Sequence, residues 1–194
     1  MEMTDLIVGL HSWIIQDGNY GEFKRGMTAP FALEFSSAIP PMELGPHDNK
    51  IPSLQHVSED AYQIIGQVVH LTDEWWVIDT GLLIYREERP PDHVRVGTWL
   101  RGGLVQIGID PFFYFERLAH QPDAPAMVYE WRIDKIEAQT APLVEVRPKQ
   151  FERDPEKLGW KEIVETRSWE DSGEYLLHCT RLDGPRRPRS RSRP

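Results

Sequence analysis

The residues Asp79, Thr80 and Gly81 form a short motif whose residue types could do chemistry directly. Two aspartates held in contact can share one proton and activate water for peptide-bond cleavage. A chain with a single such triplet could build the pair only as a homodimer. The chemistry therefore depends on whether the surrounding residues have the pattern that this site requires.

The residues around the triplet favour a structural role. In proteases of the retroviral type, alanine or serine follows the triplet, and two aliphatic residues and a glycine come later in the chain. Here Leu82 follows it, and the aliphatic residues with their glycine, 64 to 66, precede it. Three-residue matches also arise often by chance. We therefore predict that the triplet is a bend in a strand and that Asp79 is a structural hydrogen-bond acceptor.

The other reactive residue types predict no catalytic, metal or cofactor site. The seven histidines include no His-x-His or His-Glu-x-x-His spacing. His178 and Cys179 are neighbours on a predicted strand, so they point to opposite faces and cannot form a thiolate–imidazole pair. We expect Cys179 to be buried and inert. We name no catalytic residue, no metal ligand and no cofactor, and we expect a protein without enzymatic activity.

The charge of the chain is unevenly distributed. The net charge is −9, and the tail at residues 185–194 holds five arginines and no acid, so the remaining residues carry −14. An acidic body repels phosphate backbones, which argues against nucleic acid and favours a basic protein partner or a small ligand. The arginine-rich tail has no apolar residue, and we predict that it is disordered.

The single cysteine and the apolar runs limit the compartment. No internal disulfide can form, which is typical of a reducing compartment. The apolar runs are too short for a bilayer, and the start of the chain has neither a basic lead-in nor a small-residue cleavage site. We expect a cytoplasmic protein without membrane association.

Alternation with a period of two predicts strands along most of the chain. Met127, Tyr129, Trp131 and Ile133 alternate with mostly polar residues, as in a half-buried strand. We predict further strands at residues 6–15, 31–37 and 175–179, the last paired with 160–169 through a turn at 170–174, and short helical turns at 58–63 and 115–120. We expect residues 39–55 to form a surface loop. The fold class predicted is all-β, or mostly β, with few short helical turns.

Glycines inside the central strands predict a small barrel, because a strand that coils tightly must bend or bulge. Residues 56–120 combine a glycine-containing strand, a hairpin and a later strand with Val96, Gly97, Leu100 and Gly102. This order resembles the oligonucleotide/oligosaccharide-binding (OB) barrel. The predicted organisation is one β-rich unit, 1–184, in which flanking strands at 5–37 and 126–182 pack on a closed or partly open barrel.

The resemblance also implies a ligand face on the second and third strands of the barrel. There it places Trp75, Trp76, Tyr85 and Arg86 as ligand-binding residues, with aromatic rings that bind by stacking. The alternative is that these rings simply fill the core, because large aromatics supply most of the buried area of a small β-domain.

Four aromatics in succession at residues 112–115 cannot all face one core. We predict that the segment 110–118 is either a strand buried on both sides or an edge that docks a second copy in a homodimer. For the whole chain, the function expected is non-catalytic binding through a barrel face. Two alternatives stay open: an acidic adaptor or neutralising protein that covers a basic partner, and a hydrolase whose site is assembled from distant strands.

Overall fold

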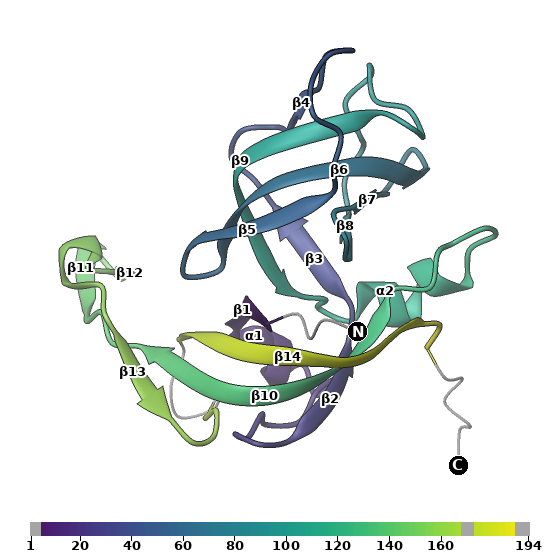
Figure 1. Cartoon of the computed structure of the whole chain (residues 1–194). Coiled ribbons are helices and arrows are strands. Elements are labelled where there is room, and N and C mark those ends of the chain that lie inside the picture. The colour runs from purple at the N-terminus through teal and green to yellow at the C-terminus, as the bar shows by residue number, and fades with distance from the viewer. Residues whose placement is uncertain (1–4, 168–172, 189–194) are drawn as a thin grey trace.

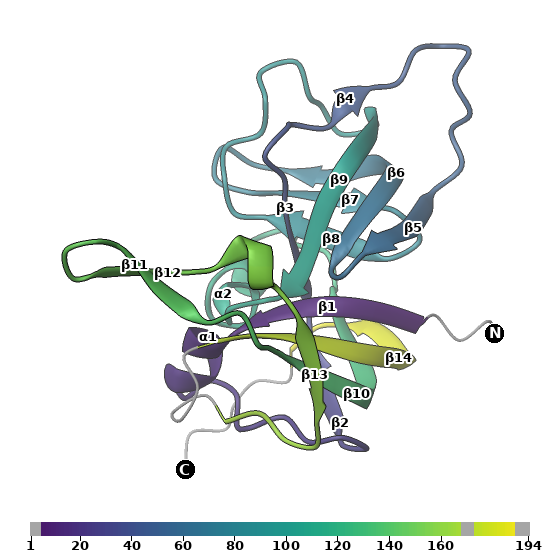
Figure 2. The same cartoon turned by 90° about the vertical axis from the view of Figure 1, so that its left-hand side faces the viewer.

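Strands dominate the protein, as the alternating sequence predicts. The computed structural model describes residues 5–167 and 173–188, and Figures 1 and 2 show two views of it. The elements are β1 (Asp5–His11), α1 (Ser12–Gln16), β2 (Thr28–Phe31), β3 (Leu33–Ser36), β4 (Met42–Glu43), β5 (Ser53–Ser58), β6 (Ala61–Leu71), β7 (Trp76–Asp79), β8 (Leu83–Arg86), β9 (Trp99–Ile109), α2 (Phe113–Glu116), the 3₁₀ turn η1 (Leu118–His120), β10 (Val128–Gln139), β11 (Leu143–Arg147), β12 (Gln150–Arg153), the 3₁₀ turn η2 (Pro155–Lys157), β13 (Trp160–Ile163) and β14 (Glu174–Arg186).

Five strands close into a ring, which is called the barrel below. They are β3, β6, β7, β8 and β9. β6 pairs antiparallel with both β7 and β9, and β7 pairs antiparallel with β8. β3 closes the ring, since it runs parallel to β8 and antiparallel to β9. β5 extends the barrel beyond β6, and β4 pairs with β9.

Two glycines allow close packing within the barrel. A Cβ at Gly66 would lie 2.4 Å from Ile78 Cγ2 and 2.6 Å from the Asp79 carbonyl oxygen. A Cβ at Gly102 would lie 2.5 Å from Val105 Cγ2. All three distances are shorter than a normal contact of a carbon atom, so a larger residue at either position would force its neighbours to move.

The two ends of the chain form a second layer, which we call the terminal sheet: β1, β2, β10, β13 and β14. Its order is β13-β10-β14-β1, with β2 beside β10. Figure 1 shows the barrel above this sheet and the β11–β12 hairpin projecting to one side. β1 joins the layers, because Gly9 pairs in parallel with Gly108 of β9.

One hydrophobic core runs through both layers. It includes Val8, Trp131 and Leu177 of the terminal sheet and Ile64 and Ile107 of the barrel, all buried. A smaller cluster fills the space between the outer side of β7 and β8 and the segment that carries α2 and η1. The barrel is therefore covered on two sides.

The aromatic run at 110–118 is not a strand, so both forms of that prediction were wrong about its structure. Asp110 Oδ1 accepts a hydrogen bond from the Tyr114 amide over 3.1 Å, which supports the short helix α2 in place of extended chain. The helix sends Tyr114 into the core and leaves Phe113 41% exposed. Self-association through this segment stays a prediction.

Several boundaries also differ from those predicted. The first strand ends at His11, where α1 begins, and residues 58–63 form a hairpin turn and the start of β6 instead of a helical turn. β13 pairs with β10, whereas the partners of β14 are β1 and β10. The predicted turn at 170–174 lies largely in 168–172, outside the described residues.

The first four residues of the arginine-rich tail, 185–188, lie within the described part of the chain. Arg186 lies in β14 and pairs with Glu130, and Arg187 donates hydrogen bonds to the carbonyl oxygens of Ala119 and Ala124 at 3.3 and 2.8 Å. Residues 189–194 lie outside the described residues. No helix within the described ranges is both long and apolar enough to cross a membrane.

Candidate functional site

The Asp-Thr-Gly triplet forms the corner between β7 and β8. Asp79 Oδ1 accepts a hydrogen bond from the Gly81 amide at 2.9 Å. Gly81 has φ +93°, a left-handed conformation that favours glycine. The prediction that Asp79 is a hydrogen-bond acceptor in a bend is thus confirmed.

The structure places the four predicted ligand-binding residues in different surroundings. Trp75 and Tyr85 are 0% exposed in the cluster beneath α2, and Trp76 is 1% exposed inside the barrel. Arg86 is half-buried and forms an ion pair with Glu88 at 2.7 Å. The three rings thus present no accessible face for stacking, and none of the four residues lines the pocket described next.

A pocket of about 380 Å³ lies between the barrel and the terminal sheet, which we call the junction pocket. Segments far apart in the sequence build it: the end of β1 with α1, the middle of β3, the β5–β6 turn, and the ends of β9, β10, β13 and β14. Its lining residues are Gly9, Leu10, His11, Trp13, Ile14, Glu34, Phe35, Ser36, Glu59, Asp60, Gln106, Gly108, Ile109, Gln139, Trp160, Glu174, Tyr175 and Leu176.

Two acids line this pocket beside a pair of glycines. Gly9 and Gly108 are paired where β1 meets β9, and Glu34 of β3 pairs with Gly108 from the other side. The Asp60 carboxylate, at the β5–β6 turn, lies against Gly9 in the space that a Cβ would occupy. A side chain at Gly9 would displace the Asp60 carboxylate, whereas a Cβ at Gly108 would make only an ordinary contact with the Gly9 carbonyl oxygen, so the glycine at position 9 is the one that keeps Asp60 at the pocket.

Burial makes both carboxylates harder to ionise. Burial raises the pKa of Glu34 to about 7, and the nearby Asp110 adds to the shift, whereas Arg86 and His11 oppose it. Burial also raises the pKa of Asp60, with the charges of Glu59 and Glu174 as further causes and His11 as an opposing one.

The described residues give neither carboxylate an adequate donor. No described residue donates a hydrogen bond to the Glu34 carboxylate, and Asp60 receives one only from its own backbone amide. Partly buried carboxylates without donors are costly, and they cluster at functional sites. The junction pocket therefore contains two acids whose hydrogen-bonding capacity is unused.

His11 is the only basic residue among those lining the pocket. Its Nδ1 lies 3.4 Å from Glu174 Oε1, and the hydrogen bond with Glu174 raises the pKa of His11. The charges of Asp60 and Glu34 act in the same direction. The lining thus has four carboxylates and one histidine, with no lysine or arginine, and its net charge is negative at neutral pH.

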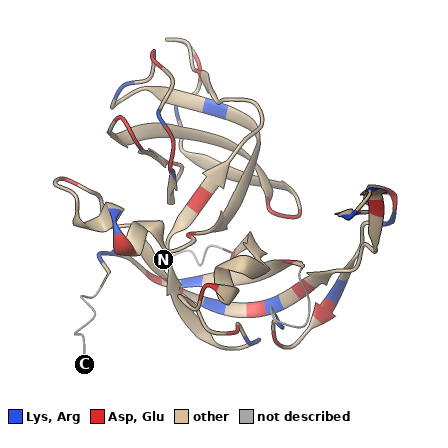
Figure 3. Cartoon of the chain, turned by 180° about the vertical axis from the view of Figure 1, so that it is seen from behind, with Lys and Arg blue, Asp and Glu red and all other residues tan. Residues whose placement is uncertain are grey.

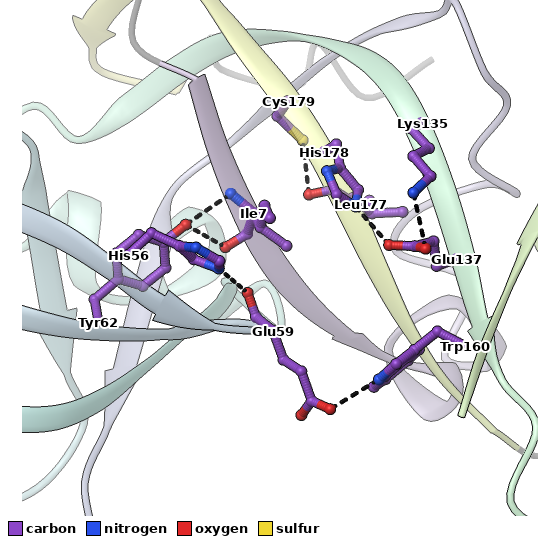
Figure 4. Close-up of polar contacts among 10 residues, drawn as sticks. All are labelled: Ile7, His56, Glu59, Tyr62, Lys135, Glu137, Trp160, Leu177, His178 and Cys179. Atoms are coloured by element: carbon purple, nitrogen blue, oxygen red, sulfur yellow. Dashed lines mark hydrogen bonds and ion pairs between the residues drawn. The ribbon is translucent and has the colours of Figure 1, made fainter. Parts of the chain in front are cut away.

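Two indoles and an amide complete the wall. Trp13 is 44% exposed. The indole Nε1–H of Trp160 donates to Glu59 Oε1 at 2.8 Å, a contact that links the terminal sheet to the β5–β6 turn (Figure 4). The Gln139 Oε1 atom is buried without a hydrogen-bond partner in the described part of the chain.

A second hollow, beside the first half of β1, has polar groups that are already paired. Tyr62 Oη donates to the Ile7 carbonyl at 2.9 Å and accepts from the Ile7 amide at 2.8 Å, which fastens the barrel to β1 (Figure 4). His178 Nε2 and Lys135 Nζ lie 2.7 and 2.8 Å from the two oxygens of Glu137. This hollow therefore offers fewer unused groups than the junction pocket.

The neighbours His178 and Cys179 behave as predicted. Cys179 is buried in the core, and burial raises the pKa of its thiol well above the usual value. His178 instead contacts Glu137. Within residues 5–167 and 173–188, no three His, Cys, Asp or Glu side chains are grouped so that they could hold a metal ion.

Sequence reasoning did not find the junction pocket. The available signals were an acid inside the apolar stretch around Glu34 and an acidic pair at 59–60 in a turn. Only the pairing of β3, β1 and β9 shows that they meet. Acidic and basic positions occur together along the terminal sheet (Figure 3), so the pocket differs from that sheet by its lack of lysine and arginine. Comparisons with protein-family models, curated proteins and solved structures found no match to this chain.

Proposed function

We propose that this protein is a non-catalytic binding protein that takes its ligand into the junction pocket. The observation that carries the proposal is the presence of two partly buried carboxylates, Glu34 and Asp60, without donors beyond a single amide. A concave site with a few convergent polar groups and perturbed pKa values is a typical ligand site. Binding would supply the missing donors and thus recover the cost of burying these groups.

On this proposal the barrel is OB-like, and the strand that closes it, β3, precedes the other four strands in the sequence. β6, the β7–β8 hairpin and β9 follow one another in the order that the resemblance describes. β3 precedes them and fills the gap between β8 and β9. Because α2 and η1 cover β7 and β8, the barrel face that binds is the one formed by β3 and β9.

A fragment screen by NMR tests where ligands bind. The full chain, labelled with ¹⁵N, is titrated with a set of small cationic, neutral and anionic fragments. We expect the indole N–H signals of Trp13 and Trp160 and the amides of Gly9 and Gly108 to shift more than the rest. Fragments that gather instead at the apolar groove beside Tyr20 and Phe115, or bind nowhere, would contradict the proposal.

A hydrolase is the second candidate, because two acids with raised pKa values share one pocket with a histidine. Glu34, with a pKa of about 7, could act as a general acid near neutral pH. A serine nucleophile is not set up, because the Ser36 hydroxyl lies 3.4 Å from Gln106 Oε1 and no described hydrogen bond joins it to His11. Hydrolysis would have to rely on the carboxylates alone, so this candidate ranks second. Turnover of chromogenic esters or glycosides that Glu34→Gln abolishes would favour the hydrolase.

A further inference from the structure

We propose that the ligand of the junction pocket carries a guanidinium group. This inference rests on the proposed function and names the chemical class of its ligand. It draws on three features of the pocket: its unused hydrogen-bonding groups, its charge and its indole rings.

Three hydrogen-bond acceptors of the pocket lack donors among the described residues, apart from the backbone amide of Asp60. They are the carboxylates of Glu34 and Asp60 and the buried Oε1 of Gln139. A guanidinium has five N–H donors in a plane and no acceptor. It can therefore satisfy several acceptors on different walls of the pocket at once, which a single hydroxyl or amide cannot do.

The charge of the lining favours a cation. Glu34, Glu59, Asp60 and Glu174 face the pocket, and His11 is the only basic residue among the described residues that line it. Asp110, buried behind Glu34, adds another acid to the local field, whereas Arg86 opposes it. A cationic ligand would reduce the repulsion among these acids, whereas an anionic ligand would increase it.

The two indoles favour a flat cation. Trp13 lines the pocket and is 44% exposed, and the Trp160 ring is held in place by the bond from its Nε1 to Glu59 Oε1 at 2.8 Å. Guanidinium planes stack on aromatic faces and interact with them electrostatically. The volume of about 380 Å³ suits one such group with a short alkyl chain.

Calorimetric titration of the full chain with n-butylguanidinium tests the proposal. n-Butylurea is the matched control, because it has nearly the same planar shape but no charge and offers a carbonyl acceptor. We expect butylguanidinium to bind at least about tenfold more tightly than butylurea. Equal binding of the two compounds, or binding of butylurea alone, would overturn the proposal.

Variants then connect the binding to the pocket. Glu34→Gln and Asp60→Asn should each weaken butylguanidinium binding about tenfold or more, because each removes a charged acceptor. Glu43→Gln, at an exposed position on β4, is the matched control and should leave the affinity unchanged. Equal losses of affinity in all three variants would indicate a nonspecific charge effect and would contradict a specific binding site in the junction pocket.

A pair of peptides distinguishes a free guanidinium compound from an arginine side chain of a partner protein. One is acetyl-Gly-Arg-Gly-amide, and the other has citrulline in place of arginine. Both sources support the guanidinium assignment, and tighter binding of the arginine peptide than of butylguanidinium would identify a protein partner. If butylguanidinium does not bind but neutral fragments shift the Trp13 and Trp160 signals, only the ligand class is wrong. If no compound binds in the junction pocket, the proposed function fails as well.

Discussion

The carboxylate of Asp60 lies directly over Gly9, so that a methyl group added at Gly9 would come 2.4 Å from Asp60 Oδ2. Because Asp60 has a short side chain, Gly9→Ala must displace its carboxylate from the pocket. We expect this substitution to weaken butylguanidinium binding about tenfold, with a change in unfolding free energy of about 1 kcal/mol or less. Calorimetry and urea unfolding measure the two effects.

Gly103→Ala is the control for this substitution. Gly103 also lies in a barrel strand, but nothing lies within 4 Å of the position where its Cβ would be. We expect neither binding nor stability to fall. A loss of affinity in Gly103→Ala equal to that in Gly9→Ala would show that the effect of Gly9→Ala does not act through Asp60.

Glu34 should make the protein less stable as the pH rises. The pKa of Glu34 is about 7 in the folded state, against 4.5 for an unperturbed glutamate side chain, so between these values the folded state binds the proton and the unfolded state has released it. Stability due to this group is therefore lost as the pH rises from about 4.5 to about 7. We expect Glu34→Gln to be roughly 1 to 3 kcal/mol more stable than the natural chain at pH 8. At pH 4 the two should match in urea unfolding, and equal stability at both pH values would exclude this account.

Binding of butylguanidinium should strengthen with rising pH around neutrality. The cation requires ionised Glu34, whose pKa is about 7, so the affinity should rise between pH 6 and pH 8 and a proton should be released on binding. Titrations in two buffers with different ionisation enthalpies measure that proton. In Glu34→Gln the release should decrease; an unchanged release would assign the proton to Asp60 or to the His11–Glu174 pair.

The Tyr85 hydroxyl donates to the buried Asp110 carboxylate at 2.5 Å and so helps to fix the chain that leads into α2. Burial raises the pKa of Asp110 to about 6, so the carboxylate is charged at pH 8 and largely protonated at pH 5. We expect Tyr85→Phe to lower the unfolding free energy by about 1 to 3 kcal/mol, with the larger loss at pH 8. In an Asp110→Asn background this pH difference should disappear, and its persistence would assign it to another group.

The β7–β8 corner should depend on Gly81 more than on the charge of Asp79. Because Gly81 has φ +93°, Gly81→Ala should cost roughly 1 to 2 kcal/mol in unfolding free energy. Asp79→Asn keeps an oxygen to accept from the Gly81 amide and should cost less than about 1 kcal/mol. If Asp79→Asn removed a measurable proteolytic activity while the protein stayed folded, the structural role of the triplet would be wrong.

The success of the sequence-based predictions depended on how local each signal was. The strand around Trp131 follows from alternation alone, and the barrel strands that contain Gly66 and Gly102 follow from glycines within apolar segments. The aromatic run at 112–115 was misassigned, because its conformation depends on a hydrogen bond from the Tyr114 amide to Asp110. Trp75, Trp76 and Tyr85 are buried on different sides of the barrel wall, which residue type alone does not show.

The sequence by itself determined the β-rich class, the glycine-containing strands of the barrel and the corner at Asp79, because these features depend on residues close together in the chain. Only the tertiary structure decided that Glu34, Asp60 and His11 share one pocket. They come from three segments, and their meeting depends on β1 pairing with β9 through Gly9 and Gly108. Burial in that pocket, which is a property of the assembled layers, then shifts the pKa values of the two acids.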